Sequence, residues 1–338
     1  MTTSAVPGFV CPACRGGLAH VGVGGESEAY ACAPCARRYP VVLGIADFRL
    51  RPDPWIGLDD DREKGRRLAE QSRELDLAGT VRAYWAMTPG TPRERAESFT
   101  AFVLDGERRS AEWLDAVERP EPRVADGPWL DVGCGTADLV AVAARRGRTV
   151  VGVDIAFRWL VVAKKRLDQA GLSATLVCCD GEHLPFADDA FARVVSLGTI
   201  EHCLDASALV AEGRRVLRGG GSMQARTVNR YTLREPHVGV WGVGFVPRRW
   251  ADAYVRWRSG QRYLHHRPLS RRELRRRFRS AGFSQVDVRP AGLLPADRAR
   301  LGRLAWAGGL YEIARDLPLV GAGLCWIAPI LDVRGQVA

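Results

Sequence analysis

Residues 129–138, WLDVGCGTAD, decide the fold of this chain. The apolar residues of WLDV are typical of a buried strand, and Gly133 and Gly135 let the backbone turn sharply and approach a ligand closely. The turn leads into a helix through Leu139 and Val140. A strand, a glycine turn and a helix in this order begin a ligand-binding α/β unit.

Strands and helices alternate after this segment. Further strands are predicted by apolar runs at residues 149–153, 174–178, 193–197, 222–227, 283–290 and 327–334. Ser270 and Glu273 form a capping box, which predicts the start of a helix. This alternation predicts an α/β protein with a doubly wound parallel sheet, which binds ligands at the carboxyl ends of its strands.

The acidic residues around the glycine turn argue against a dinucleotide ligand. The fingerprint G-x-G-x-x-G needs a third glycine where this chain has Asp138, and a diphosphate would also meet Asp131. The same carboxylates attract a ligand that carries an ammonium and a sulfonium, such as S-adenosylmethionine. Asp154 ends the second strand, where an acid accepts hydrogen bonds from ribose hydroxyls. Asp180 ends the third strand and is placed to accept from an adenine amino group.

Five motifs within residues 125–228 extend this interpretation. WLDVGCGTAD, VVGVDI, CCDGEHLPFADDAFARVVS, IEH and LVAEGRRVLRGGGS resemble, in order and spacing, the motifs of class I S-adenosylmethionine-dependent methyltransferases. Within this class the motifs resemble type 11, the group that includes ubiquinone and menaquinone biosynthesis enzymes. The resemblance implies a Rossmann-like, doubly wound sheet of seven strands with S-adenosylmethionine as cofactor. The residues that it assigns to the cofactor are Asp131, Gly133, Gly135, Asp154, Ile155, Asp180 and Gly181.

Four of the nine cysteines form a metal-binding pattern near the N-terminus. Two C-x-x-C pairs have the spacing of a zinc ribbon, in which four thiolates bind one structural Zn²⁺ tetrahedrally. The ligands are Cys11, Cys14, Cys32 and Cys35. Disulfides are the alternative, but a bridge within either pair would be strained. The segment resembles the small zinc-ribbon protein that activates several RNA and protein methyltransferases, here fused to a catalytic domain.

These patterns suggest three parts of the chain. We expect a zinc ribbon in residues 1–50, a helical lid or linker in residues 51–120 and a methyltransferase domain in residues 121–338. The proline- and charge-rich stretch 118–128 marks the last boundary. An aromatic, arginine-rich insertion at residues 229–268 interrupts the α/β rhythm, and the resemblance implies that it forms the acceptor site.

Two histidines are the candidate catalytic bases. His202, the first choice, follows the fourth strand next to Glu201, which is also assigned to the catalytic site, and His237 lies in the insertion. A base assists methyl transfer to a hydroxyl, whereas positioning of the reactants supplies most of the rate. The alternative for His202 is a packing role under the cofactor. His265 and His266 are expected in a solvated loop.

The insertion also supplies the residues expected to contact the acceptor. They are Asn229, Arg230, Tyr231 and Trp241. The alternative is that the aromatic side chains of the insertion only pack it onto the sheet.

Composition adds weaker constraints on partners and location. The net charge of +10 suggests nucleic acid only weakly, because 46 of the 49 basic residues are arginine, a bias typical of GC-rich genomes. No stretch reaches the roughly 18 apolar residues of a membrane span, and the N-terminus lacks the basic and apolar regions of a signal peptide. We therefore expect a cytoplasmic protein. The apolar stretch 317–331 either makes a peripheral membrane contact or packs in the core.

The sequence therefore predicts a methyltransferase that uses S-adenosylmethionine and carries structural zinc. The preferred acceptor is a small or lipid-linked biosynthetic molecule that is methylated on oxygen. One alternative is a base methyltransferase for rRNA or tRNA, in which the ribbon recognises the nucleic acid. Another is a methyltransferase-like binding partner without catalytic activity.

Overall fold

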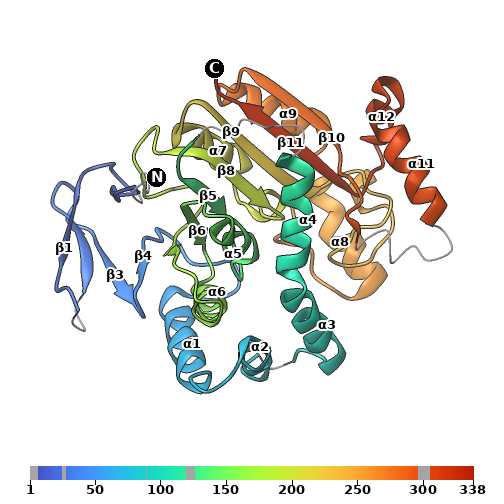
Figure 1. Ribbon diagram of the computed structural model, residues 1–338. Coiled ribbons are helices and arrows are strands. Elements are labelled where there is room, and N and C mark those ends of the chain that lie inside the picture. Colours follow the sequence, from blue (N-terminus) through green and yellow to red (C-terminus); the bar gives the residue numbers. More distant parts are fainter. Residues whose placement is uncertain (1–6, 25–27, 89, 119–125, 296–304) are drawn as a thin grey trace. The chain divides into compact units, whose positions relative to one another are not determined.

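The computed structural model describes residues 7–24, 28–88, 90–118, 126–295 and 305–338 (Figure 1). The chain divides into two compact units, Met1–Val194 and Val195–Ala338. The expected boundary at residues 118–128 lies mostly outside the described residues.

The first unit is built on strands in the order β1-β2-β3-β4-β7-β6-β5. Strands β4, β7, β6 and β5 are parallel, whereas β1 to β4 pair antiparallel. β5, β6 and β7 are mostly buried apolar runs, as a sheet covered on both faces requires. The strands are β1 Leu18–Val21, β2 Ala29–Cys32, β3 Arg38–Val42, β4 Ile45–Asp47, β5 Trp129–Val132, β6 Val150–Asp154 and β7 Thr175–Cys178.

The cysteine-rich segment, residues 1–50, joins the parallel strands through β4. Ala46 lies opposite Val177 and Asp47 lies opposite Cys178 in this pairing. The pairing satisfies backbone groups of β7 that would otherwise form an open sheet edge. The described residues form eleven strands, four in the cysteine-rich segment and seven in residues 126–338, so the segment adds its strands to the seven expected of the methyltransferase part.

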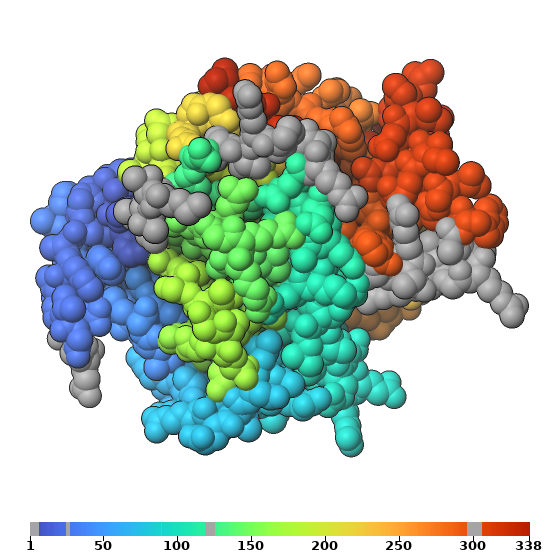
Figure 2. Space-filling view, viewed as in Figure 1, coloured from blue at the N-terminus to red at the C-terminus, as the bar shows by residue number. Residues whose placement is uncertain are grey.

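In the described part of the first unit, six helices accompany the strands. The apolar faces of α5 and α6, which follow β5 and β6, are buried. α1 packs on α6 at Gly65, where an added Cβ would lie 2.6 Å from the ring of Phe157. Figure 2 shows α1 and α2 (light blue) and α3 and α4 (teal) at the surface beside α5 and α6 (green). The helices are α1 Leu58–Gln71, α2 Leu77–Ala86, α3 Arg93–Leu104, α4 Gly106–Glu118, α5 Asp138–Arg145 and α6 Phe157–Gln169.

A buried network of ion pairs links β4, α1 and the start of α6. Asp61 of α1 accepts from Arg49 Nη1 at 2.7 Å and from Arg158 Nη1 at 2.9 Å. It also accepts from the backbone N–H of Phe157 at 2.8 Å, at the positive end of the α6 dipole. Arg49 in turn binds Asp47 of β4 at 2.7 Å. Because removing one partner of a buried ion pair is costly, this network holds the cysteine-rich segment and the parallel strands together.

The second unit contains antiparallel strands in the order β9-β11-β10. The sequence pattern predicts parallel strands here, and this expectation is wrong because β11 lies between β9 and β10 and runs opposite to both. The strands are β9 Leu217–Val228, β10 Gln285–Pro290 and β11 Ile330–Gln336, while β8, Phe191–Leu197, crosses from the first unit into the second.

The helices of the second unit include one whose start the sequence predicts. The capping box of α9 is confirmed, because Ser270 accepts from the N–H of Glu273 and Glu273 accepts from the N–H of Ser270. Part of the apolar C-terminal stretch forms α12, which lies beside α11 (Figure 1). No helix in the described ranges is long and apolar enough to span a membrane. The helices are η1 Ile200–His202, α7 Ala206–Arg215, η2 Val243–Phe245, α8 Arg248–Ser259, α9 Arg271–Ser280, α11 Ala305–Asp316 and α12 Pro318–Leu324.

Candidate functional site

The turn between β5 and α5 has the sharp bend that its glycines predict. Gly133 and Gly135 have φ angles of 80° and 51°. Ala137 also has a positive φ of 61° and is fully buried. An alanine in this conformation costs about 1–2 kcal/mol, so the surrounding contacts maintain a strained turn.

Asp131 is a buried carboxylate without a compensating cation among the residues that the structure describes. It lies in β5 with 4% of its surface exposed. Burial raises the pKa of Asp131 well above the usual carboxyl range, and the charges of Asp138 and Asp154 raise it further. Asp138 itself is paired with Arg166 at 3.3 Å. The negative potential at the turn therefore centres on Asp131.

Asp154 faces the same turn from the end of β6. Its carboxylate accepts from the N–H of Gly135 and from the N–H of Ala156, each at 2.8 Å. Burial raises the pKa of Asp154, while these two hydrogen bonds oppose the rise. Each carboxylate oxygen keeps a lone pair, so Asp154 is held in place and can still accept from a ligand. The carbonyl of the next residue, Ile155, accepts from Arg49 at 3.0 Å.

Asp180 lies beyond β7, next to the half-buried Gly181. Each of its two carboxylate oxygens already has two polar partners. Arg51 binds both of its oxygens, at 2.9 Å and 2.7 Å. The N–H of Glu182 and the ring of His183 use the remaining lone pairs, at 2.9 Å and 3.1 Å. An adenine amino group would have to displace one of these donors. Sequence patterns could not identify Arg51, because it lies 129 residues from its partner.

The buried charge of Asp131 leads to a stability prediction. At pH values between the ordinary carboxyl pKa and the raised pKa of Asp131, the folded protein binds more protons than the unfolded chain. The free energy of unfolding therefore falls as pH rises through this window. An uncharged amide avoids this cost. We expect Asp131→Asn to raise the Tm of the ligand-free protein by about 2–4 °C at neutral pH, roughly 1 kcal/mol. Thermal denaturation should show the gain shrinking in acid, and Asp168→Asn, at an exposed site, should show no gain.

The four N-terminal cysteines meet in the first unit. The Sγ atoms of Cys11 and Cys35 are 3.6 Å apart and those of Cys14 and Cys32 are 3.4 Å apart. All four Sγ atoms lie within 4.8 Å of one another. Tetrahedral Zn²⁺ with Zn–S bonds of about 2.3 Å separates its sulfurs by about 3.8 Å, so the donor set and its spacing fit this ion. The hydroxyl of Tyr39, at 3.1 Å from Cys11 Sγ, adds a hydrogen bond.

The two candidate bases lie together in the second unit. The rings of His202 and His237 have centroids 5.0 Å apart, and His266 is 5.1 Å from the first and 4.3 Å from the second. The expectation that His266 belongs to a solvated loop is wrong, because its ring is half-buried in this cluster. Burial lowers its pKa to about 4. Burial also lowers the pKa of His237, but the hydrogen bond with Glu235 outweighs this and the pKa is raised overall.

Glu201 precedes His202 in the chain, and both of its carboxylate oxygens accept hydrogen bonds. Its side chain is buried and accepts from Thr227 Oγ1 at 2.7 Å and from the N–H of Val228 at 3.3 Å. These bonds tie η1 to the end of β9. We therefore treat Glu201 as a positioning residue.

The four expected acceptor residues have different surroundings. Asn229 is fully buried, and its amide donates to the carbonyls of Cys325 and Ala328 at 3.0 and 2.8 Å. Its side chain therefore links the end of β9 to the segment that precedes β11. Trp241 is 60% exposed, which contradicts a packing role for its side chain. Tyr231 is half-buried beside Phe245.

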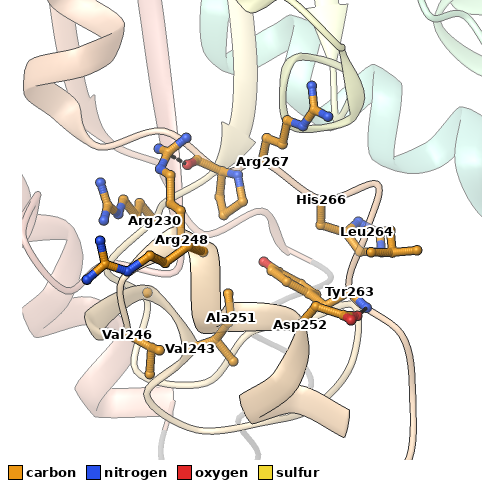
Figure 3. Close-up of a pocket in the computed structure, with 13 residues that line it drawn as sticks. Arg230, Val243, Val246, Arg248, Ala251, Asp252, Tyr263, Leu264, His266 and Arg267 are labelled. Atoms are coloured by element: carbon orange, nitrogen blue, oxygen red, sulfur yellow. Dashed lines mark hydrogen bonds between the residues drawn. The ribbon is translucent and has the colours of Figure 1, made fainter.

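Of these four residues, Arg230 lines a cavity of about 380 Å³ in the second unit. Figure 3 shows Arg230 and Arg248 on one side of this cavity and Tyr263, Leu264 and His266 on the other. The cavity is thus lined by arginines and by one member of the histidine cluster.

Comparison with known families identifies the segment that holds the glycine turn. Residues 130–224 match the family described as "Methyltransferase domain". The matched segment, which is similar to a methyltransferase domain, includes Asp131, Asp154 and Asp180.

Curated relatives match at low identity. Methyltransferase GfsG of Streptomyces halstedii is 39% identical over 108 residues, 31% of this chain and 39% of that protein. The ubiquinone biosynthesis O-methyltransferase of Methylocella silvestris is 33% identical over 175 residues, 50% of this chain and 63% of that protein. The chain spans less than two thirds of the length of these relatives.

Solved structures also match. Phosphoethanolamine N-methyltransferase 2 of Haemonchus contortus, in complex with S-adenosyl-L-methionine, is 19% identical with a TM-score of 0.48, and the match covers 76% of this chain and 59% of that chain. A complex between the Haloferax volcanii Trm112 methyltransferase activator and a methyltransferase is 17% identical with a TM-score of 0.45, covering 73% of this chain and 97% of that chain.

Proposed function

We propose that this protein transfers the methyl group of S-adenosylmethionine to an acceptor. The observation that carries the proposal is the buried carboxylate of Asp131, which the described residues leave without a cation, inside the methyltransferase domain. A sulfonium or ammonium group would compensate this charge, whereas a diphosphate would be repelled by it.

Bound S-adenosylmethionine would supply an electrophilic methyl group. We assign Asp131, Gly133 and Gly135 to its methionine part, Asp154 and Ile155 to the ribose, and Asp180 and Gly181 to the adenine. His183, whose side chain is 41% exposed, is the donor most easily displaced from Asp180 when adenine binds. The protein then has to align the acceptor atom with the methyl carbon and the sulfur, which is mainly a matter of positioning.

We propose oxygen as the methylated atom and a small or lipid-linked biosynthetic molecule as the acceptor. Two features support this class: relatives named as ubiquinone biosynthesis O-methyltransferases, and a cavity of about 380 Å³ within the insertion at residues 229–268. A cavity of this size suits a small molecule. Arg230 and Arg248 in its lining favour an acceptor with acidic or strongly polar groups.

His202 and His237 are the proposed bases for a hydroxyl acceptor. As the acceptor oxygen forms its bond to the methyl carbon and the carbon–sulfur bond breaks, a base takes the hydroxyl proton. Glu235 orients the ring of His237 at 2.6 Å. His237 is therefore the better positioned of the two.

We propose that the chain is organised in three parts. The ribbon, residues 1–50, would hold structural Zn²⁺ at its four cysteines, since all four coordination positions would be filled by protein. Residues 51–120 would form a helical lid or linker, and residues 121–338 the methyltransferase domain. The buried network around Asp61 supports a structural role for the ribbon, because it joins β4 to α1 and α6.

Calorimetry with S-adenosylmethionine tests the proposal directly. Micromolar binding supports an enzyme, and absence of binding supports a partner without catalytic activity. The net charge of +10 keeps a base methyltransferase for rRNA or tRNA as the second candidate. Binding to bulk RNA that weakens steeply with salt would favour that candidate, and methyl transfer to small hydroxylated acceptors without RNA binding would exclude it.

We propose a peripheral membrane contact through α11 and α12. Apolar side chains are exposed over both helices and their flanks, namely Trp306, Leu310, Ile313, Leu317, Leu319, Val320, Trp326 and Ile327. Trp306 and Trp326 in this set suit the headgroup level of a bilayer, and a lipid-linked acceptor would be met there.

Leu319, which is 89% exposed, provides the test of this contact. We expect Leu319→Asp to reduce co-sedimentation with phosphatidylcholine–phosphatidylglycerol vesicles at least fivefold, because a charge opposes insertion of the apolar surface. Val23→Asp, at another exposed apolar position, should sediment like the unchanged protein. Equal sedimentation of the two variants would argue for a protein partner at α11 and α12 instead.

A further inference from the structure

Three histidines from distant parts of the second unit converge on one point. His202 lies in η1, His237 lies between β9 and η2, and His266 lies in the loop before α9. Each offers a ring nitrogen, and the three nitrogens lie within 4.8 Å of one another. Among the residues that the structure describes, the only other cluster of this kind is formed by the four N-terminal cysteines.

Two of the rings also make a hydrogen bond to a group outside the three histidines. His237 Nδ1 is 2.6 Å from Glu235 Oε1, and Glu235 is itself buried and held by the N–H groups of His237 and Val238. The His202 ring bonds to the backbone of His265. Histidines that bind metals usually donate their second N–H to a carboxylate or to a backbone carbonyl in this way.

The third ring has an unsatisfied nitrogen. His266 Nδ1 is buried and has no hydrogen-bond partner within the described part of the chain. Leaving a buried polar atom unpaired destabilises the folded protein, and a metal–nitrogen bond at this atom would remove that cost. His266 also lines the cavity of about 380 Å³, so a ligand can reach this side of the cluster (Figure 3).

We propose that His202, His237 and His266 bind a divalent transition metal ion of the zinc type. Three imidazoles suit Zn²⁺ and its first-row neighbours, whereas Mg²⁺ and Ca²⁺ prefer oxygen ligands. Three protein ligands leave a fourth position for water or for an oxygen atom of a molecule in the cavity. The proposed histidine site shares no residue with the cysteine cluster. Metal binding there does not require the protein to transfer methyl groups.

Metal binding changes what these histidines can do. A nitrogen that is bonded to a metal has no lone pair with which to accept a proton. His202 and His237 therefore act either as metal ligands or as free bases, and the metal content of the active protein decides between the two roles.

Cobalt substitution of the tag-free, full-length protein tests the proposal. Co²⁺ in the cysteine cluster gives intense sulfur-to-metal charge-transfer absorption, whereas Co²⁺ bound by nitrogen and water gives only ligand-field bands. We expect two Co²⁺ per chain, one of each spectroscopic type. His266→Ala should lose the nitrogen-bound ion, with at least 100-fold weaker binding, and keep the charge-transfer band.

Two further variants make this result specific. Glu235→Gln should weaken binding of the nitrogen-bound ion by about 10–100-fold, as expected for loss of an orienting carboxylate. His265→Ala, which removes the neighbouring imidazole but keeps the backbone group that contacts His202, should bind both ions. A single thiolate-bound ion in the unchanged protein would overturn the proposal, even if a variant failed to fold. Retention of the second ion by folded His266→Ala would also overturn it.

Discussion

Cys32→Ser is expected to abolish binding of the Zn²⁺ proposed for the cysteine cluster and to destabilise the first unit by about 5 kcal/mol or more. Structural zinc supplies much of the folding free energy of a small domain, and Cys32 is one of four ligands that cannot be replaced by water without loss of affinity. Besides the buried network around Asp61, the described part of the cysteine-rich segment has short strands and an aromatic cluster in which Phe9 and Tyr39 pack on Phe48 at centroid distances of 5.0 and 5.2 Å.

The loss should extend beyond the cysteine-rich segment. β4 pairs with β7, and Val10 donates to the carbonyl of Pro185 at 3.0 Å, so unfolding of the segment exposes the edge of the parallel strands. The measurements are metal content, thermal denaturation and limited proteolysis of residues 1–50. Cys203→Ser, at a half-buried cysteine outside the cluster, is the matched control. A Cys32→Ser protein that lacks the ion but keeps its Tm and its resistance to protease would show that the cluster is not a structural metal site.

Asp154→Ala is expected to weaken binding of S-adenosylmethionine by about 100-fold or more. Each hydrogen bond to a charged group contributes about 1.5–3 kcal/mol, and the carboxylate at the end of β6 is proposed to accept from two ribose hydroxyls. The substitution also removes the acceptor that the N–H of Gly135 uses, so the glycine turn loses a contact that shapes it. Isothermal titration calorimetry measures the change in Kd.

Two comparisons separate a binding effect from unfolding. Asp154→Asn keeps the size of the side chain and one acceptor oxygen, and we expect it to lose about 10-fold in affinity. Asp168→Ala, in the exposed part of α6, should bind S-adenosylmethionine normally. If folded Asp154→Ala binds within threefold of the unchanged protein, Asp154 does not hold the ribose and the proposed assignment of the cofactor site fails.

The features that sequence patterns could predict are local ones. The turn at Gly133 and Gly135, the strand before it and the capping box at Ser270 each depend on residues a few positions apart, and the structure contains all three. The convergence of the four cysteines follows from their spacing, because two tight turns bring each pair together and one pairing of strands brings the pairs together.

Other features depend on contacts between residues far apart in sequence. Arg51 binds Asp180, which is 129 residues later in the sequence. Asp61 accepts a hydrogen bond from the start of α6, which is 96 residues later. No periodicity or motif marks such partners, since an arginine that binds a buried carboxylate looks in sequence like any solvated arginine. His266 was expected in solvent for the same reason.

The sequence by itself determined the class of domain and the position of its acidic turn, because backbone freedom at glycine and the order of strands and helices are properties of short segments. Only the tertiary structure decided that the cysteine-rich segment extends the sheet, that the strands of the second unit are antiparallel, and that His202, His237 and His266 form one cluster. These features depend on the burial of apolar surfaces that belong to residues far apart in sequence. Such burial is determined by the packing of a whole unit and not by any short segment.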